Sequence, residues 1–402
     1  MTQRFFFPSK SLKTLPAWLT VPLSAFLITR IIVWLGGYFA ELMLPSATGD
    51  GLWHARPDNI WLDIWARWDS GFYLKIIEEG YFYQVGVQSS VAFFPVYPLF
   101  ASLLNTVLDN SVLSAVIVSH ICLFFALIYL YRLTEFEFDS AAAARAVFYI
   151  ASFPTAFFFS AVYTESTFIL FAIATMYYAR TRQWGWAAVM GIMACATRIV
   201  GFVLGFSLIL EWMRSLGWQW TQIHRAEMWK KTVRNGLAEW YNLVFIGMLA
   251  LGVLSYMLFL YQNFGDPIAF WTVQSAWGRK ESGVIAVIGG DLWKILNQDW
   301  IAGKIWWHVA VDISAFIFVI IAGFKVLRRL GASYAIFAFL SILIPANSGS
   351  GSLVRYALVI FPVFMMLGWW GQRPWLDRLI STLFCVFLGI CSAVFVNWVF
   401  MG

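Results

Sequence analysis

The chain has 402 residues, of which 61% are hydrophobic and 12% are charged, and it contains 23 Trp and 38 Phe residues. This composition excludes an ordinary soluble domain, because apolar runs of ~20 residues, the length that crosses a hydrocarbon core as a helix, recur along the chain. The net charge of +6 is better explained by basic cytoplasmic loops than by nucleic-acid binding, so we expect no nucleic-acid partner.

We therefore predict an all-α, polytopic integral membrane helix bundle that forms a single domain over residues 1–402. The first span begins at Ala17 and continues to about Met43, too long for the ~7–15 apolar residues of a signal peptide. Because Lys and Arg mark the cytoplasmic side, we expect a cytoplasmic N-terminus. A first outer loop then covers about residues 44–110, and seven carboxylates lie between Glu41 and Glu79.

Within this loop, residues 94–108 form an apolar segment that is short for a span and contains two prolines. We interpret it as a half-embedded helix on the outer face, because a full span would place the basic loop, about residues 213–239, outside. A second outer loop follows over about residues 263–304. The pattern predicts about 11 transmembrane helices, with interfacial helices in the first outer loop.

The segment Arg67-Trp68-Asp69 in the first outer loop most strongly indicates chemistry. Asp69 comes just before a helical pattern, so one interpretation is a plain helix N-cap. The other is a general base, because a hydroxyl is a poor nucleophile unless a positioned carboxylate takes its proton. Asp63 competes for that role, but its apolar flanks resemble those of an interfacial helix.

Two arginines, Arg198 and Arg355, lie close to membrane depth on the outer side. Charge at that depth is costly unless it is paired. The guanidinium fork fits phosphate oxygens, so a lipid phosphate is one predicted partner, and an ion pair with Glu165 is the alternative. Glu165 itself either favours a helix start or holds an arginine or a sugar hydroxyl. Arg30, in the middle of the first span, needs a partner that the sequence does not name.

The second outer loop carries Gln274, Trp277 and Arg279 beyond a Gly-Asp-Pro turn. This cluster suits sugar or phosphate contact and suits an interfacial aromatic belt nearly as well. The four His residues show no i, i+4 pairing, so we expect neither a metal site nor a cofactor.

In this order the motifs resemble those of the Pig-V-type GPI mannosyltransferases and their prokaryotic relatives, which belong to the GT-C superfamily of membrane glycosyltransferases. The resemblance extends from about residue 63 to residue 368. Six motifs in sequence carry it: Arg67-Trp68-Asp69-Ser70, Ala92-Phe93-Phe94-Pro95-Val96-Tyr97-Pro98, Pro154-Thr155-Ala156 with Tyr163-Thr164-Glu165-Ser166, Thr197-Arg198, Gly265-Asp266-Pro267-Ile268-Ala269-Phe270, and Arg355-Tyr356.

The resemblance implies a glycosyltransferase, usually a mannosyltransferase, that takes its sugar from a polyprenyl- or dolichyl-phosphate donor. Transfer to a hydroxyl acceptor on a glycolipid, glycan or protein would occur outside the cytoplasm, with inversion and with Asp69 as the catalytic base. We expect the donor phosphate to contact Arg355, Arg198 and Tyr356. We expect substrate contacts from Arg67, Trp68, Tyr163, Glu165, Gln274, Trp277 and Arg279.

Three alternatives remain open. A transporter or lipid flippase would use the charged outer loop as a substrate gate, but transporters often carry internal repeats and none is convincing here. A structural membrane subunit and a GT-C enzyme for another sugar, such as arabinose or glucose, are the others. The compact length favours a prokaryotic plasma membrane over the ER membrane, with membrane lipids as surroundings.

Overall fold

The structure is a computed structural model that describes residues 15–44, 52–278, 282–297 and 306–400. These ranges contain α-helices, short 3-10 turns and loops, and no strand, which confirms the all-α prediction. Five helical stretches in the described part are long and apolar enough to cross a membrane. They are Ala17–Met43, Ser111–Glu137, Tyr241–Phe264, His308–Arg329 and Pro374–Val396. The chain is thus an integral, multi-pass membrane protein, but the predicted count of about 11 spans is not confirmed.

The helices differ widely in length, from single turns to membrane-crossing rods. In chain order they are α1 (Ala17–Met43), α2 (Ile60–Asp63), α3 (Ser70–Glu79), α4 (Val96–Leu108), α5 (Ser111–Glu137), α6 (Ser140–Ser152), α7 (Glu165–Arg180), α8 (Trp184–Cys195), α9 (Val203–Ser215), α10 (Ala226–Ala238), α11 (Tyr241–Gly247), α12 (Ala250–Phe264), α13 (Ala269–Thr272), α14 (Val284–Asn297), α15 (Trp306–Arg329), α16 (Ala332–Ala346), α17 (Leu353–Leu358), α18 (Phe361–Trp370) and α19 (Pro374–Val396).

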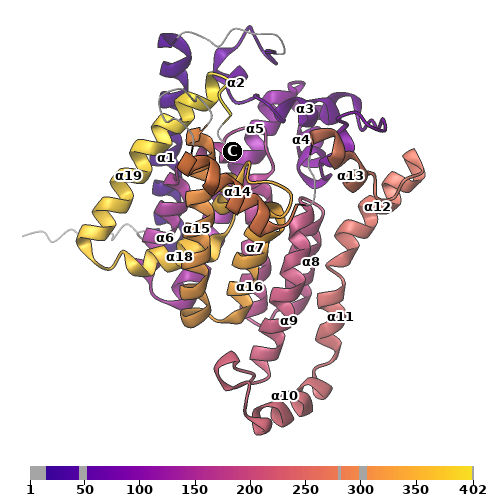
Figure 1. Ribbon diagram of the computed structural model, residues 1–402, viewed down its shortest axis with the longest axis vertical. Helices are drawn as coiled ribbons and strands as arrows, with labels where there is room; N and C mark the ends of the chain where they lie inside the picture. Colours follow the sequence, from indigo (N-terminus) through magenta and orange to yellow (C-terminus); the bar gives the residue numbers. More distant parts are fainter. Residues whose placement is uncertain (1–14, 45–51, 279–281, 298–305, 401–402) are drawn as a thin grey trace, which may run out of the picture.

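Helices that are distant in sequence pack side by side in the bundle (Figure 1). The first helix, α1, lies along the last, α19, while α6 packs against α18 and α5, and α7 lies between α5 and α8. Glycine permits the closest of these contacts. A Cβ atom at Gly368 would lie 2.4 Å from the Ala142 carbonyl oxygen, and one at Gly252 would lie 2.3 Å from that of Ile192. Small residues at helix contacts are typical of membrane bundles.

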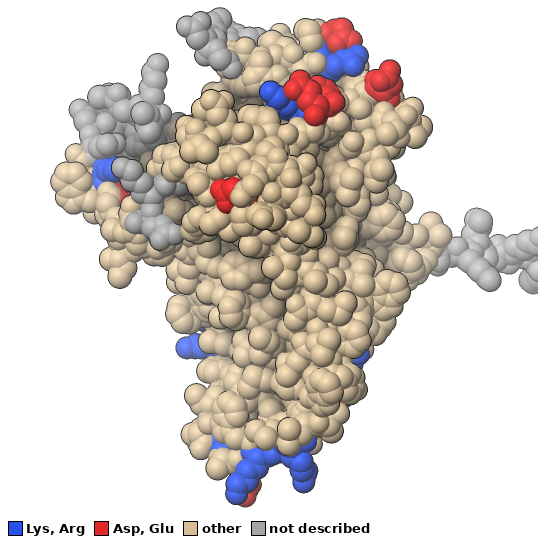
Figure 2. All heavy atoms as spheres, turned by 90° about the vertical axis from the view of Figure 1, so that its right-hand side faces the viewer, with Lys and Arg blue, Asp and Glu red and all other residues tan. Residues whose placement is uncertain are grey.

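On the face shown in Figure 2, charged side chains gather toward the two ends of the molecule, and the surface between them is largely uncharged. One end carries α2, α3 and α4, and the opposite end is formed by α10 (Figure 1). The α10 end presents the exposed cations Lys230, Lys231 and Arg234. An uncharged band between two charged ends is what a lipid-embedded surface requires.

A buried charge network ties four helices together at the C-terminal ends of α5 and α7. Arg180 pairs with Glu137, and its Nη1 lies 3.0 Å from Oε1 of Glu211. The Tyr334 hydroxyl donates to the Glu137 carboxylate at 2.8 Å. The network joins α5, α7, α9 and α16, so it stabilises the bundle where the basic loop emerges.

The cation in the middle of the first span has backbone partners instead of an acid. The Arg30 guanidinium donates to the carbonyl oxygens of Ala151 and Ala156, both at 2.9 Å, and to the Ser160 hydroxyl at 2.8 Å. These carbonyls belong to the segment where α6 ends and the chain turns. Arg30 thus joins α1 to that turn, and these groups are the partners that its position within the first span requires.

Helices occur in both segments that were predicted as outer loops; those in the first were expected, whereas those in the second were not. The first contains α2, α3 and α4, and α4 packs against α3 and α5. The second, expected as a loop over residues 263–304, contains α13 and the 14-residue helix α14, which packs against α15 and α16.

Candidate active site

A buried carboxylate between two arginines forms the centre of the candidate site. Glu165 begins α7 and is 0% exposed. Its Oε1 accepts hydrogen bonds from Nη1 of Arg198 at 2.7 Å and from Nε of Arg355 at 2.5 Å. Burial alone would raise the pKa of this carboxyl, but Arg355 and Arg198 outweigh burial and lower the pKa below its ordinary value. Glu165 is therefore ionised and fixes both guanidinium groups.

Asp69 reaches the same cluster from the first outer loop. Its Oδ2 lies 3.3 Å from Nη1 of Arg355, so Arg355 bridges Asp69 and Glu165. Asp69 occupies the N-cap position of α3, yet among the described residues its side chain makes no capping hydrogen bond. The side chain remains 31% exposed. Asp69 is therefore not a plain helix cap among the described residues, and its role as a general base stays a prediction.

The loop that carries Asp69 is fastened to the segment just before Glu165. The Tyr163 hydroxyl, which is fully buried, donates to the Arg67 carbonyl oxygen at 3.1 Å. The Ser70 hydroxyl donates to the Val162 carbonyl oxygen at 3.3 Å. These two bonds hold residues 67–70 in a fixed register against residues 162–163, which places Asp69 and Glu165 on the two sides of Arg355.

Trp68 adopts a backbone conformation that bulky residues rarely take. Its φ is +56°, in the left-handed region, where the cost for such a residue is on the order of 1–3 kcal/mol. The indole is 36% exposed and packs edge-on against Trp398 and Phe400, with ring centroids 5.8 and 5.4 Å apart. A strained residue directly before Asp69 indicates that the surrounding packing determines where the carboxylate points.

Arg67 and Asp63 support this loop from inside. Arg67 is 0% exposed, its Nη1 lies 2.7 Å from Oδ2 of Asp63, and its Nε donates to the Val396 carbonyl oxygen at 3.1 Å. Asp63 also bonds the His54 ring at 2.7 Å and accepts from the Arg56 backbone. Burial alone would raise the pKa of Asp63, but its hydrogen bonds lower it overall.

Because the oxygens of Asp63 are engaged and its side chain is nearly inaccessible, Asp63 is poorly placed to act as a base. The same geometry gives Arg67 a positioning role in the loop. The predicted contact between Arg67 and a substrate stays a prediction.

Aromatic rings surround the two guanidinium groups. The Arg355 guanidinium carbon lies 4.5 Å from the centre of the Tyr163 ring and 5.0 Å from that of Phe158. The Arg198 guanidinium carbon lies 5.4 Å from the centre of the Tyr356 ring. Contacts at these distances stabilise a cation and exclude water from it. Tyr163, Tyr356 and both arginines, which were predicted separately, are thus parts of one cluster.

Sequence reasoning missed Tyr73, which is buried on α3 one turn after Asp69. Burial first, and then the nearby charge of Glu165, raises the pKa of its hydroxyl above the ordinary value. The i, i+4 spacing from Asp69 was the signal available, because residues so spaced share a helix face.

A second missed residue is Asp312 on α15. Its Oδ1 accepts a hydrogen bond from the Val354 backbone N–H at 2.8 Å, and the carboxylate is buried. Ser352, just upstream, has a φ of +76°. Asp312 therefore fastens this turn and sets the backbone directly before Arg355. An acid within a membrane span was the available signal.

The second outer loop approaches the site through α3. Trp277 packs against Phe72 and Phe93, with ring centroids 5.7 and 6.1 Å away. Gln274 donates to the Phe270 carbonyl oxygen at 3.0 Å, within its own turn. Arg279, the third residue predicted here, lies outside the described residues. The substrate contacts predicted for this loop stay predictions.

Comparison with known protein families shows that residues 52–281 match a family model described as "Mannosyltransferase (PIG-V)". No curated protein matches the chain. ArnT from Cupriavidus metallidurans bound to undecaprenyl phosphate is similar in structure, with a TM-score of 0.51 and 10% identity over 95% of this chain and 76% of that one. That likeness concerns the fold, which is of the GT-C membrane type.

An Archaeoglobus fulgidus oligosaccharyltransferase, solved tethered to an acceptor peptide, is also similar. Its TM-score is 0.47 at 11% identity, over 95% of this chain and 56% of that chain. The chain thus spans little more than half the length of that enzyme.

Proposed function

The chain belongs to the PIG-V mannosyltransferase family, whose model covers more than half of it, and we propose that it transfers mannose from a polyprenyl-phosphate donor to a hydroxyl acceptor, with Asp69 as general base. Membership of the family makes the chain a membrane glycosyltransferase. One observation carries the finer proposal: Asp69 is partly exposed, makes no capping bond within the described chain, and faces Arg355.

The contact between Asp69 and Arg355 is the looser of the two that Arg355 makes with acids. At 3.3 Å it is longer than the 2.7–2.9 Å typical of charge-assisted bonds, whereas the bond from Nε to Glu165 is 2.5 Å. A donor phosphate that binds Nη1 of Arg355 would displace Asp69 and leave Glu165 in place. Donor binding would then release the carboxylate that has to accept the proton of the incoming hydroxyl.

The charges of the cluster support a phosphate as the displacing group. Arg198 and Arg355 balance Glu165 and Asp69, so the free cluster is neutral. Release of Asp69 leaves one net positive charge facing the donor, held by a guanidinium that is already positioned and dry. This charge stabilises the phosphate as it leaves the anomeric carbon, so we propose that no metal ion is needed.

A single base suits a direct displacement. The hydroxyl attacks the anomeric carbon from the side of Asp69 while the phosphate departs on the opposite side toward the arginines, which inverts the configuration at that carbon. The structural neighbour ArnT was solved with undecaprenyl phosphate bound, in agreement with a polyprenyl carrier for the donor proposed here. The proposed acceptor is a hydroxyl on a glycolipid, a glycan or a protein, and residues other than Asp69 select it.

The orientation follows from the two charged ends. The α10 end carries the exposed Lys230, Lys231 and Arg234, so the positive-inside rule assigns it to the cytoplasm. The end with α2, α3 and α4 then lies outside, together with Asp69 (Figure 1). We propose a prokaryotic plasma membrane as the home of the protein, and one integral domain over residues 1–402.

The test is Asp69→Asn in the purified full-length protein, given radiolabelled polyprenyl-phosphate mannose and a lipid extract of the source membranes as the acceptor pool. Loss of a positioned base is expected to lower transfer by ~10²–10⁴-fold. Glu227→Gln is the control, because Glu227 is an exposed acid of α10, at the opposite end of the molecule from Asp69. Transfer by Asp69→Asn at the rate of the Glu227→Gln control would refute the assignment.

A further inference from the structure

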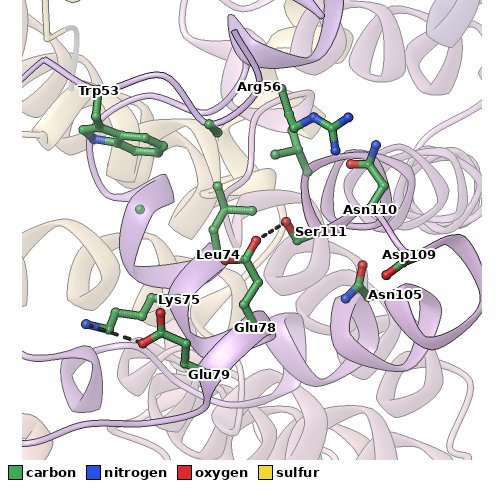
Figure 3. A pocket seen from close by; sticks show the side chains of 13 residues that line it. Trp53, Arg56, Leu74, Lys75, Glu78, Glu79, Asn105, Asp109, Asn110 and Ser111 are labelled. Atoms are coloured by element: carbon green, nitrogen blue, oxygen red, sulfur yellow. Dashed lines mark hydrogen bonds and ion pairs between the residues drawn. The ribbon is translucent and has the colours of Figure 1, made fainter. Parts of the chain in front are cut away.

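A polar pocket of about 550 Å³ lies beside α3, outside the cluster of Glu165 and the arginines. Its volume falls within the range of sites for small molecules, ~300–1,000 Å³. Figure 3 shows its wall, which is built from one face of α3, from the turn between α4 and α5, and from the segment before α2. We call it the α3 pocket; the residues used below are Trp53, Arg56, Lys75, Glu78, Asn105 and Ser111.

The charges of the α3 pocket do not suit an anionic ligand. Its two cations are already engaged, because Arg56 pairs with Asp58 and Lys75 pairs with Glu79. Glu78 adds a carboxylate whose Oε1 accepts from the Ser111 hydroxyl at 2.5 Å. Asp109 also lines the pocket, so three carboxylates accompany two cations and the wall has no surplus of positive charge. Its carboxylate, amide and hydroxyl groups suit a ligand rich in hydroxyl groups.

One wall atom has an unmet hydrogen-bonding need. Oδ1 of Asn105 is shielded from solvent and, within the part of the chain that the structure describes, has no hydrogen-bond partner. Asn105 lines the pocket from α4 (Figure 3). Because this atom is also shielded from a molecule the size of water, a ligand hydroxyl reaches it only when the Asn105 amide turns toward the pocket, and a bond made there would offset the cost of the unpaired acceptor.

An aromatic wall connects the α3 pocket with the loop that carries Asp69. Trp53 packs closely on Gly71, where a Cβ atom would lie 3.1 Å from the indole and would push the ring away by a few tenths of an ångström. The indole of Trp53 then contacts Trp398 edge-on at 5.9 Å, and Trp398 contacts Trp68 at 5.8 Å. Indole faces are suited to the apolar faces of sugar rings as well as to other rings.

We propose that the α3 pocket is a subsite for neutral carbohydrate, which holds the part of the acceptor that lies beyond the hydroxyl that receives mannose. The pocket begins at Gly71, about 3 Å of helix rise from Asp69 but on the opposite face of α3, because two residues turn a helix by about 200°. A saccharide seated there can extend its terminal hydroxyl around the N-terminus of α3 toward the carboxylate. The inference rests on the proposed function for the identity of the ligand as an acceptor.

Binding is measured without transfer, so that the two proposals can fail separately. Methyl α-mannoside, methyl β-glucoside and methyl N-acetyl-β-glucosaminide are the probes, added at up to tens of millimolar to the full-length protein in detergent. Saturation-transfer NMR reports contact between protein and probe. We expect a signal for at least one probe, and the same signal in Asp69→Asn, because the subsite does not include Asp69.

Asn105→Trp fills the pocket and removes its unpaired acceptor, and Glu78→Gln alters its hydrogen bonding with little change in shape. Thr106→Trp is the matched control, because Thr106 is the next residue of α4, is exposed and does not line the pocket. We expect both pocket variants to weaken the signal about fivefold or more, the loss expected for one hydrogen bond to a shielded group, and Thr106→Trp to retain it.

Equal signals in Asn105→Trp and Thr106→Trp, or no signal for any probe with the wild type, would overturn the subsite. Loss of mannose transfer in Asp69→Asn together with unchanged probe binding in the pocket variants would retain the proposed function and reject the subsite. Probe binding confined to the pocket in a protein that transfers no mannose would retain the subsite and reject the proposed function.

Discussion

Replacing the buried acid of the cluster, Glu165→Gln, is the sharpest test of how the site is held. The substitution keeps the shape of the side chain and removes its charge. Two hydrogen bonds from charged donors end on Oε1 of Glu165, at 2.7 Å from Arg198 and 2.5 Å from Arg355. Each bond of this kind contributes ~1.5–3 kcal/mol to stability.

The loss of both bonds sets an upper range of roughly 3–6 kcal/mol. The cost of leaving a buried charge without its partner, ~3–5 kcal/mol, falls in the same range. Arg355 keeps some compensation, because Asp69 lies 3.3 Å from its Nη1. We therefore expect Glu165→Gln to lower the free energy of unfolding by about 3 kcal/mol, at the lower end.

Unfolding by SDS titration in mixed micelles measures this difference, with Glu227→Gln as control, because Glu227 is exposed on α10. The control is expected to change stability by less than ~0.5 kcal/mol. Adding Arg198→Met to Glu165→Gln removes one of the two unpaired cations, so the double variant should lose less stability than the sum of the two single variants.

The same substitution tests the proposed release of Asp69. Without Glu165, Arg355 has Asp69 as its remaining acid, so the base is held more tightly and transfer should fall along with stability. A change below ~1 kcal/mol in Glu165→Gln, or strict additivity with Arg198→Met, would show that the cluster is not held through Glu165.

Two further predictions concern residues that position the site. Asp312→Ala leaves the Val354 N–H without its acceptor, so Arg355 should shift and the rate of transfer should fall on the order of 10- to 100-fold. Asp312→Asn retains an acceptor oxygen and should lose less activity. Equal losses in the two variants would contradict this role of Asp312. Asp63→Asn weakens the pair with Arg67. Folding lowers the pKa of Asp63, so the stability that the Asp63 carboxylate contributes to the wild type is complete above its unfolded pKa of ~3.9 and is lost as the pH falls further. The Tm difference between wild type and Asp63→Asn should therefore be constant from about pH 5 to 8 and shrink below about pH 4, and a difference that grows on acidification would contradict it.

The composition and the run lengths were enough to predict the class of the fold and several parts of the site. Membrane helices follow from local hydropathy, because a run of ~20 apolar residues finds its lowest free energy across the bilayer whatever the rest of the chain does. The family motifs, taken together and in order along the chain, likewise placed Asp69, Arg198, Glu165 and Arg355 among the candidates.

The pairing among these candidates was beyond the sequence. Arg355 is 190 positions from Glu165 and 286 from Asp69, and no periodicity relates residues so far apart. The sequence analysis left a phosphate and Glu165 as alternative partners for the arginines. The packing of α7, α17 and the first outer loop made Glu165 the partner of both and left Asp69 the more weakly bound carboxylate.

The sequence alone therefore predicts the membrane helix bundle and the residue types that a lipid-phosphate chemistry requires, because both depend on local composition. The tertiary structure decided which of the acids is structural and which is available. Asp63 and Asp69 lie six residues apart in one loop, yet Asp63 is closed in by His54 and Arg67 whereas Asp69 is open to solvent on one side. Accessibility is a property of the packing around a side chain, and that packing comes from helices remote in sequence.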